Sequence, residues 1–325
     1  MLTHAVVPQE ISMPKASSLG RLIKTISPGT QVFAHDGPVE MLDLTSVKDA
    51  DFLILATDNL NAEIMVGQLC LWLRIPLIQA AVHGDTLVSQ VRFFGIGQQS
   101  ACPACGYSRT EWSALNRQTN YSCEAGVRGG MKAKISGPPT MSVSFLCSLA
   151  ADLCLAQFLR YTLQLGSAVE NTILEFCMYT HKTAVSPLRR NPNCPCDHTH
   201  YTRVCTLGQI SEISLTEIAG IAGYAGESDL NGISFMLGNM QYCEQGFCKC
   251  RQNRFLKRFF HPGEWLGRCS SCNENIYPHP FSTFSHVPAA LVADQMNCRL
   301  GELGIEAEKW IMLRGDVRSF LLISP

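Results

Sequence analysis

Apolar residues in the first hundred positions occur in short continuous runs that alternate with a stretch of helical spacing. Residues 50–56 and 76–82 are such runs, which are typical of strands buried on both faces of a sheet. Residues 60–73, between them, have the length and spacing of a helix. Further apolar patterns predict strands at residues 87–94 and 172–180. The order strand, helix, strand predicts an α/β fold with a mostly parallel sheet.

Three other segments complete this part of the chain. Residues 19–26 have helical spacing that ends at a Pro-Gly pair, and residues 31–34 predict a short strand. Residues 141–165 are a long apolar stretch with two charged residues, Asp152 and Arg160. A charge near the centre of a membrane span costs about 2.5–3.5 kcal/mol. We therefore interpret this stretch as a helix buried in a protein core, and we expect no contact with a membrane.

A change of composition near Tyr201 predicts a domain boundary. We expect one domain over residues 1–200 and a smaller α+β extension over residues 201–325. The extension contains a helical piece, a cysteine-rich hairpin region and a terminal strand pair, at residues 214–222, 242–279, 310–313 and 317–323.

Composition restricts the function. The chain has 26 basic and 27 acidic residues, so it is not a strongly basic nucleic-acid binder. A basic and aromatic run at residues 251–260 has the pattern of a single-strand binder, but it is short and the net charge is near zero, so we expect no nucleic-acid partner. The first residues lack the basic and apolar regions of a secretory signal, so we expect a cytoplasmic protein. In a reducing compartment, its 16 cysteines point first to metal ligands or nucleophiles.

Two short cysteine knuckles, about 90 residues apart, predict a first structural zinc site. They contain Cys102 and Cys105 in a C-x-x-C motif, and Cys194 and Cys196 in a C-x-C motif. Four thiolates in a tetrahedral array are what structural zinc accepts. The second knuckle is unusually short, so His198 or His200 is an alternative ligand. The competing interpretation is a set of buried free cysteines.

A second pair of knuckles predicts another structural zinc site in the C-terminal extension. Cys248 and Cys250 are followed, after 18 residues, by Cys269 and Cys272, a pattern similar to a zinc ribbon. Cys243 is a spare cysteine that could replace Cys248. Neither predicted site leaves a coordination position open, so both are expected to be structural.

Two residues outside the knuckles are candidates for chemistry. Asp58 follows the first buried strand, and ligands bind at the carboxyl ends of strands in sheets of this kind, although a plain helix cap is an equal alternative. Cys123 lies in a polar, glycine-containing stretch that precedes three cations, and nearby cations favour the nucleophilic thiolate.

Together these motifs resemble the ThiF/MoeB/HesA family of ubiquitin-activating-enzyme-like adenylyltransferases. The resemblance covers about residues 5–200. It is carried by Ser12–Ala16, Ala56–Asn59, Ile75–Ala80, Cys102–Cys105, Cys123–Val127 and Asn193–Cys196, in the order of that family.

The resemblance implies a Rossmann-like fold that binds ATP and magnesium and adenylates the C-terminal glycine of a ubiquitin-like or sulfur-carrier protein. By position, it implies that Lys15 contacts the ATP phosphates and that Asp58, with its neighbour Asn59, belongs to the nucleotide and magnesium site. It also implies that Cys123 accepts the activated acyl group. The first four knuckle cysteines would match the structural zinc of the family. We expect a homodimer, or a heterodimer with an adenylating subunit.

The chain also departs from the family. It contains no G-x-G-x-x-G turn, and Glu63 stands where the family usually has an arginine. Without that turn, helix N-terminal amides are not arranged to hold phosphates. We therefore expect an adenylation domain that is incomplete at its N-terminus, either truncated or completed by another chain. The alternative is a non-catalytic subunit that docks a ubiquitin-like protein or a complete adenylating partner.

Overall fold

The computed structural model describes residues 13–113, 143–166, 170–224 and 232–324, apart from residues 38, 40, 41, 43, 58, 207, 251, 252, 307 and 317. The chain divides into two compact units, residues 1–198 and 199–325. This division falls two residues before the boundary expected from composition. Each unit is described by itself.

Unit 1 is built on a five-stranded sheet in the order β1-β2-β3-β4-β5. The strands are β1 (Leu53–Leu55), β2 (Leu77–His83), β3 (Val88–Phe94), β4 (Thr172–Cys177) and β5 (Lys182–Pro187). The α/β class is confirmed, but only β1 and β2 pair in parallel, and the other neighbours are antiparallel. The expectation of a mostly parallel sheet was therefore wrong. Only four residues join β2 to β3, and four join β4 to β5, which is too short for a parallel crossover.

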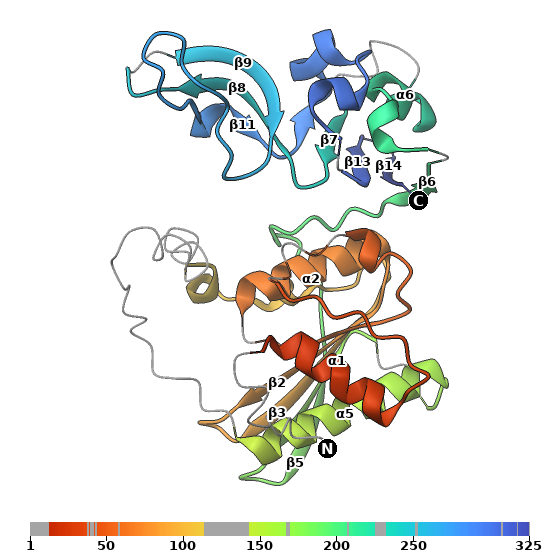
Figure 1. The fold of residues 1–325 in the computed structure, drawn as a ribbon. Coiled ribbons are helices and arrows are strands. Elements are labelled where there is room, and N and C mark those ends of the chain that lie inside the picture. The colour runs from red at the N-terminus through yellow and green to blue at the C-terminus, as the bar shows by residue number, and fades with distance from the viewer. Residues whose placement is uncertain are drawn as a thin grey trace. The chain divides into compact units, whose positions relative to one another are not determined.

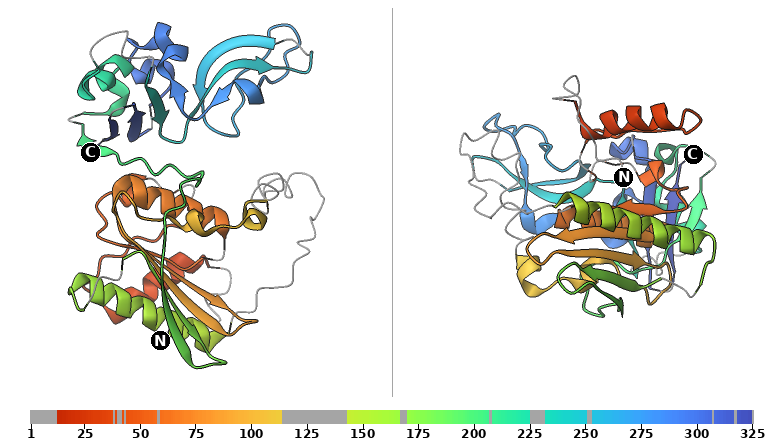
Figure 2. Two further views of the ribbon diagram at one scale, coloured as in Figure 1. Left: turned by 180° about the vertical axis from the view of Figure 1, so that it is seen from behind. Right: turned by 90° about the horizontal axis from the view of Figure 1, so that it is seen from below.

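Two helices cover opposite faces of this sheet, as Figures 1 and 2 show. Helix α2 (Leu60–Leu73) packs over a cluster that includes Leu77 and Phe94. Helix α5 (Ser144–Thr162) packs over a cluster that includes Ile78 and Phe93. Successive strand residues point to opposite faces, so neighbouring positions supply the two cores.

Helix α5 differs from the fully buried helix that its composition predicted. Its buried residues are Leu146, Ala150, Cys154 and Gln157, whereas Leu155 and Leu159 are exposed. Its apolar character is therefore divided between a face on the sheet and a face away from it. In the part of the chain that the structure describes, no helix has both the length and the hydropathy needed to cross a membrane.

Helix α1 (Lys15–Ile26) precedes the sheet and folds back on the segment that follows it. A Cβ atom on Gly20 would lie 3.4 Å from Val32 Cγ1 and 3.6 Å from Ala34 Cβ. The segment at residues 31–34 is not a strand, contrary to its predicted state. Val32 and Ala34 lie against α1, whereas the Phe33 side chain between them is exposed.

Unit 2 contains two sheets and the short helix α6 (Leu215–Ile221). The first sheet has the order β12-β7-β13-β14-β6, and the second has β10-β8-β11 with β9 paired to β8. The strands are β6 (Thr202–Cys205), β7 (Ser234–Leu237), β8 (Gln241–Phe247), β9 (Asn253–Phe260), β10 (Tyr277–Pro278), β11 (Thr283–Phe284), β12 (Val287–Pro288), β13 (Trp310–Arg314) and β14 (Ser319–Ile323). Strands β13 and β14 form the predicted terminal pair, and Ser214 caps α6 in a capping box with Glu217.

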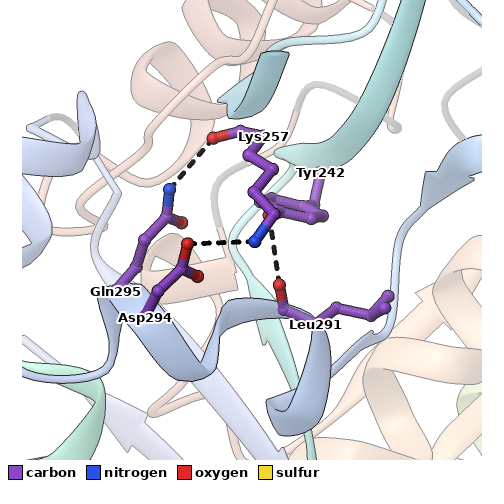
Figure 3. A network of polar contacts seen from close by, with 5 residues as sticks. All are labelled: Tyr242, Lys257, Leu291, Asp294 and Gln295. Atoms are coloured by element: carbon purple, nitrogen blue, oxygen red, sulfur yellow. Dashed lines mark hydrogen bonds and ion pairs between the residues drawn. The ribbon is translucent and has the colours of Figure 1, made fainter. Parts of the chain in front are cut away.

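A bulge in the β8–β9 pair is held by the 3₁₀ segment η8 (Ala289–Gln295), as Figure 3 shows. Lys257 has a positive φ of 41° at this bulge. Its backbone carbonyl accepts a hydrogen bond from Gln295 Nε2 at 3.0 Å, and its Nζ pairs with Asp294 Oδ2 at 2.9 Å. Tyr242 Oη also donates to the Leu291 carbonyl at 3.3 Å. These contacts between η8 and the two strands therefore fix a strained position of the sheet.

Candidate functional site

Four donor side chains of unit 1 meet in one group, which we call cluster 1: Cys102, Cys105, Cys194 and His198. Their ligand atoms all lie within 4.8 Å of one another. Cys102 precedes the 3₁₀ turn η4 (Pro103–Gly106) after β3, Cys105 lies within this turn, and the other two donors lie in the segment after β5. The structure thus brings together both predicted knuckles, with His198, the alternative ligand, in the place expected for Cys196. His200 lies outside this group.

The spacing of cluster 1 fits a tetrahedral zinc ion. Zinc–sulfur bonds of about 2.3 Å give sulfur–sulfur edges of about 3.8 Å, and a sulfur–nitrogen edge of about 3.5 Å. Cys102 Sγ lies 3.8 Å from Cys105 Sγ and 3.7 Å from Cys194 Sγ. Cys105 Sγ lies 3.4 Å from His198 Nε2. The donors are therefore already spaced as ligands of one ion.

Helix α2 contacts both segments that form cluster 1, the turn with Cys102 and Cys105 and the segment with Cys194 and His198. A Cβ atom on Gly67 would lie 2.5 Å from Pro103 Cδ, so the first knuckle approaches the helix at a position that only glycine allows. On the next residue, Gln68 Nε2 donates to the Asp197 carbonyl at 2.5 Å, and Gln68 Oε1 accepts from the Asp197 N–H at 2.9 Å. Asp197 lies between Cys196 and His198 in the sequence. The two hydrogen bonds from Gln68 therefore fix the backbone of the segment that carries His198.

Hydrogen bonds within cluster 1 shift the pKa values of its side chains. Hydrogen bonds to Cys105 and Cys194 raise the pKa of His198 to about 9. Hydrogen bonding to Cys102 lowers the pKa of Cys196, but hydrogen bonding to Cys194 and burial raise it, with a net increase to about 12. Metal ligands bind in their deprotonated forms, so a zinc ion entering cluster 1 would release protons.

The second group, cluster 2, consists of Cys248, Cys250, Cys269 and Cys272 in unit 2, all within 4.8 Å of one another. It lies on a small apolar core with Leu266. Cys248 Sγ lies 3.4 Å from Cys269 Sγ, and Cys250 Sγ lies 3.9 Å from it. Four thiols in this arrangement could hold a metal ion of the zinc type.

Backbone N–H groups favour the thiolate form of Cys269 in cluster 2, and a thiolate is the form that binds a metal cation. The N–H groups of Ser271 and Cys272 hydrogen-bond to Cys269 and lower its pKa to about 5, whereas hydrogen bonding to Cys250 raises the pKa of Cys248 to about 12. Cys243, the predicted spare ligand, is used elsewhere. Its thiol donates to the Gln245 carbonyl at 2.8 Å, and it is not a member of the cluster.

The residues that the family resemblance places at ATP are only partly visible. Lys15 is exposed at the start of α1, where the Asp36 carboxylate accepts hydrogen bonds from the Ser17 N–H and hydroxyl groups. Asn59 caps α2, because its Oδ1 accepts from the N–H groups of Asn61 and Ala62 at 2.9 and 3.4 Å. Asp58 and Cys123 lie outside the described residues.

Glu63 faces the protein core. It is buried in the first turn of α2, and Tyr107 Oη donates to its Oε2 at 2.7 Å. Burial, followed by this contact, raises the pKa of Tyr107. The centroid of the Trp112 ring lies 5.7 Å from that of the Tyr107 ring. The carboxylate that replaces the family arginine is therefore bound within the protein.

Sequence reasoning did not find Gly67, Gln68 or Tyr107 as contributors to this region. Each acts on a partner distant in sequence; Gln68, for example, binds a backbone 129 residues away. A single glycine in a helix was the one local signal of a close approach.

A comparison with models of protein families supplies the observation that decides the family. The model of the ThiF family matches residues 4–196, which is more than half of the chain. The chain belongs to the ThiF family. The resemblance inferred from the motifs is thereby confirmed. The three cysteines of cluster 1 lie within the matched region, and His198 lies two residues beyond it.

Solved structures were also compared with this ThiF-family chain. Escherichia coli MccB, in a crystal structure with AMPCPP and MccA, is 15% identical, with a TM-score of 0.42 over 59% of this chain and 53% of MccB. PaaA is 15% identical, with a TM-score of 0.35 over 56% of this chain and 58% of PaaA. The chain thus spans about half the length of the MccB structures it matches. No curated protein matches the chain.

Proposed function

We propose that this chain takes part in the ATP-dependent adenylation of the C-terminal carboxylate of a small ubiquitin-like or sulfur-carrier protein. The observation that carries the proposal is the ThiF family match over residues 4–196. Adenylation activates a carboxylate by joining it to AMP. An oxygen of the carrier carboxylate forms a bond to the α-phosphorus of ATP, and pyrophosphate leaves.

The residues of this chain have the chemical types that such a reaction needs. Lys15 supplies a cation for the negative charge of the phosphates, and Asp58 supplies a carboxylate for Mg²⁺, which when bound neutralises further phosphate charge. Cys123 is the candidate acceptor of the activated acyl group: its thiolate would form a thioester as AMP leaves. The zinc ions proposed for clusters 1 and 2 are structural, because each cluster offers four protein ligands.

A second function is favoured by the residue in the arginine position and by the missing glycine-rich turn. The residue in the arginine position is Glu63, whose carboxylate is bound inside the protein by Tyr107. It places negative charge where the family resemblance implies positive charge, and the sequence has no G-x-G-x-x-G turn. In this case the chain would be a non-catalytic subunit, paired with a complete adenylating subunit that it helps to dock on the carrier.

Binding of a fluorescent ATP analogue in the presence of Mg²⁺ tests the proposal and separates the two functions. For the catalytic function, we expect binding that weakens at least tenfold in Lys15→Ala and in Asp58→Ala. Lys24→Ala is the matched control, because Lys24 is an exposed lysine in the last turn of the same helix. If the chain alone binds no analogue, standalone catalysis is excluded. The second function then requires a co-purified partner that restores pyrophosphate exchange.

A further inference from the structure

Cluster 1 contains one more donor than a tetrahedral ion can accept. Cys196 packs against the same apolar group as Cys194, and its thiol hydrogen-bonds to Cys102 and Cys194. It nevertheless lies outside the group of four whose ligand atoms are mutually within 4.8 Å. Some feature of the fold must therefore place His198, rather than Cys196, at the fourth position.

The side chain of Gln68 hydrogen-bonds to the backbone between these two competitors. Its amide binds both polar backbone groups of Asp197, at 2.5 and 2.9 Å. These two bonds restrict the backbone on both sides of Asp197 and thereby fix where the side chains of Cys196 and His198 point. Gln68 is held on a long, well-capped helix, so the restriction is rigid.

We propose that Gln68 is a positioning residue that selects His198 over Cys196, so that cluster 1 binds zinc through three thiolates and one imidazole. Groups that orient metal ligands from outside the coordination sphere commonly change metal affinity by about 10–100-fold when mutated. Here the expected effect is on the identity of the fourth ligand. The proposal concerns the metal site alone and does not depend on the adenylation activity.

Cobalt substitution in the 325-residue chain tests this selection, because the absorbance of thiolate-to-cobalt charge transfer rises with the number of bound thiolates. Cluster 1 would contribute three thiolates and cluster 2 four. In the wild-type background, Cys196→Ser should leave this absorbance unchanged. Gln68→Met, which keeps the side-chain shape but removes both hydrogen bonds, should admit Cys196 and raise the absorbance by about one seventh. Adding Cys196→Ser to Gln68→Met should abolish that increase.

Asn61→Ala, which removes another amide from the same helix, is the control and should give the wild-type spectrum. A decrease of one thiolate in the single variant Cys196→Ser would show that Cys196 is already a ligand, and would overturn the proposal. An unchanged spectrum in Gln68→Met would equally overturn it, because the amide would then not select the ligand. Since Cys196→Ser alone decides the ligand set, the proposal stays testable even if Gln68→Met folds poorly.

Discussion

Replacing Gly67 with alanine should have two opposing effects on stability: a higher helix propensity of α2 and a steric clash with Pro103. Gly67 is buried in the middle of α2, where alanine is about 1 kcal/mol more favourable than glycine in an unhindered helix. The new Cβ would lie 2.5 Å from Pro103 Cδ and 3.0 Å from Pro103 Cγ. Overpacking of this kind costs typically about 1–3 kcal/mol. The proline ring is rigid and next to the ligand Cys102, so the upper part of that range applies.

We therefore expect Gly67→Ala to lower the free energy of unfolding of the zinc-loaded protein by about 1–2 kcal/mol. Urea denaturation followed by circular dichroism measures this change, and a chromophoric chelator measures zinc retention. The loss should shrink once zinc is removed, because the knuckle is then free to move away from α2. Weaker zinc retention should accompany the loss of stability.

Gly220→Ala is the matched control for this experiment. Gly220 lies in α6 and is exposed, and a Cβ atom added to it would have no other atom within 4 Å, so this substitution should stabilise unit 2 by about 0.5–1 kcal/mol. If Gly67→Ala stabilises the zinc-loaded protein as Gly220→Ala does, the close contact between α2 and the metal knuckle does not exist in solution.

Three further predictions concern other parts of the two units. Tyr107→Phe should lower the free energy of unfolding by about 1.5–3 kcal/mol in urea denaturation, because it removes the donor to the buried Glu63 carboxylate; an unchanged midpoint would contradict that hydrogen bond. Cys269→Ser should reduce bound zinc from two ions per chain to one by elemental analysis, and retention of both ions would exclude cluster 2 as a site. Hydrogen bonds from Ser214 lower the pKa of Glu217, so the stabilisation from this carboxylate is complete above its ordinary pKa and is lost as the pH falls through its lowered, folded-state pKa. Glu217→Gln should accordingly destabilise unit 2 at pH 7 but have little effect at pH 2; an equal effect at both pH values would refute the role of the charge.

The local elements were predictable where one segment contains its own signals. Helix α2 has the predicted bounds because Asn59 caps its start and Arg74, with a left-handed backbone, ends it. Strand direction was not predictable in this way. The apolar pattern of residues 87–94 marks a strand buried in the sheet but does not say which way the strand runs, and the four-residue turn before it makes the pairing antiparallel.

The same limit applies to the metal ligands. Cysteine spacing identified both knuckles, because each knuckle is a local feature. It left the choice among Cys196, His198 and His200 open, because that choice depends on the side chain of Gln68 from a distant helix. The roles of Asp58 and Cys123 stay predictions.

His198 is the last residue of unit 1, so the four donors of cluster 1 are complete only when the whole unit has been synthesised. His198 follows Cys105 by 93 residues, so at about 5–20 residues per second the ribosome delivers it roughly 5–20 s after the first two thiols. For that interval, the nascent protein presents an open pair of thiols with no partner segment. A metal ion can therefore meet the full set of four donors of cluster 1 only after residues 1–198 have been synthesised.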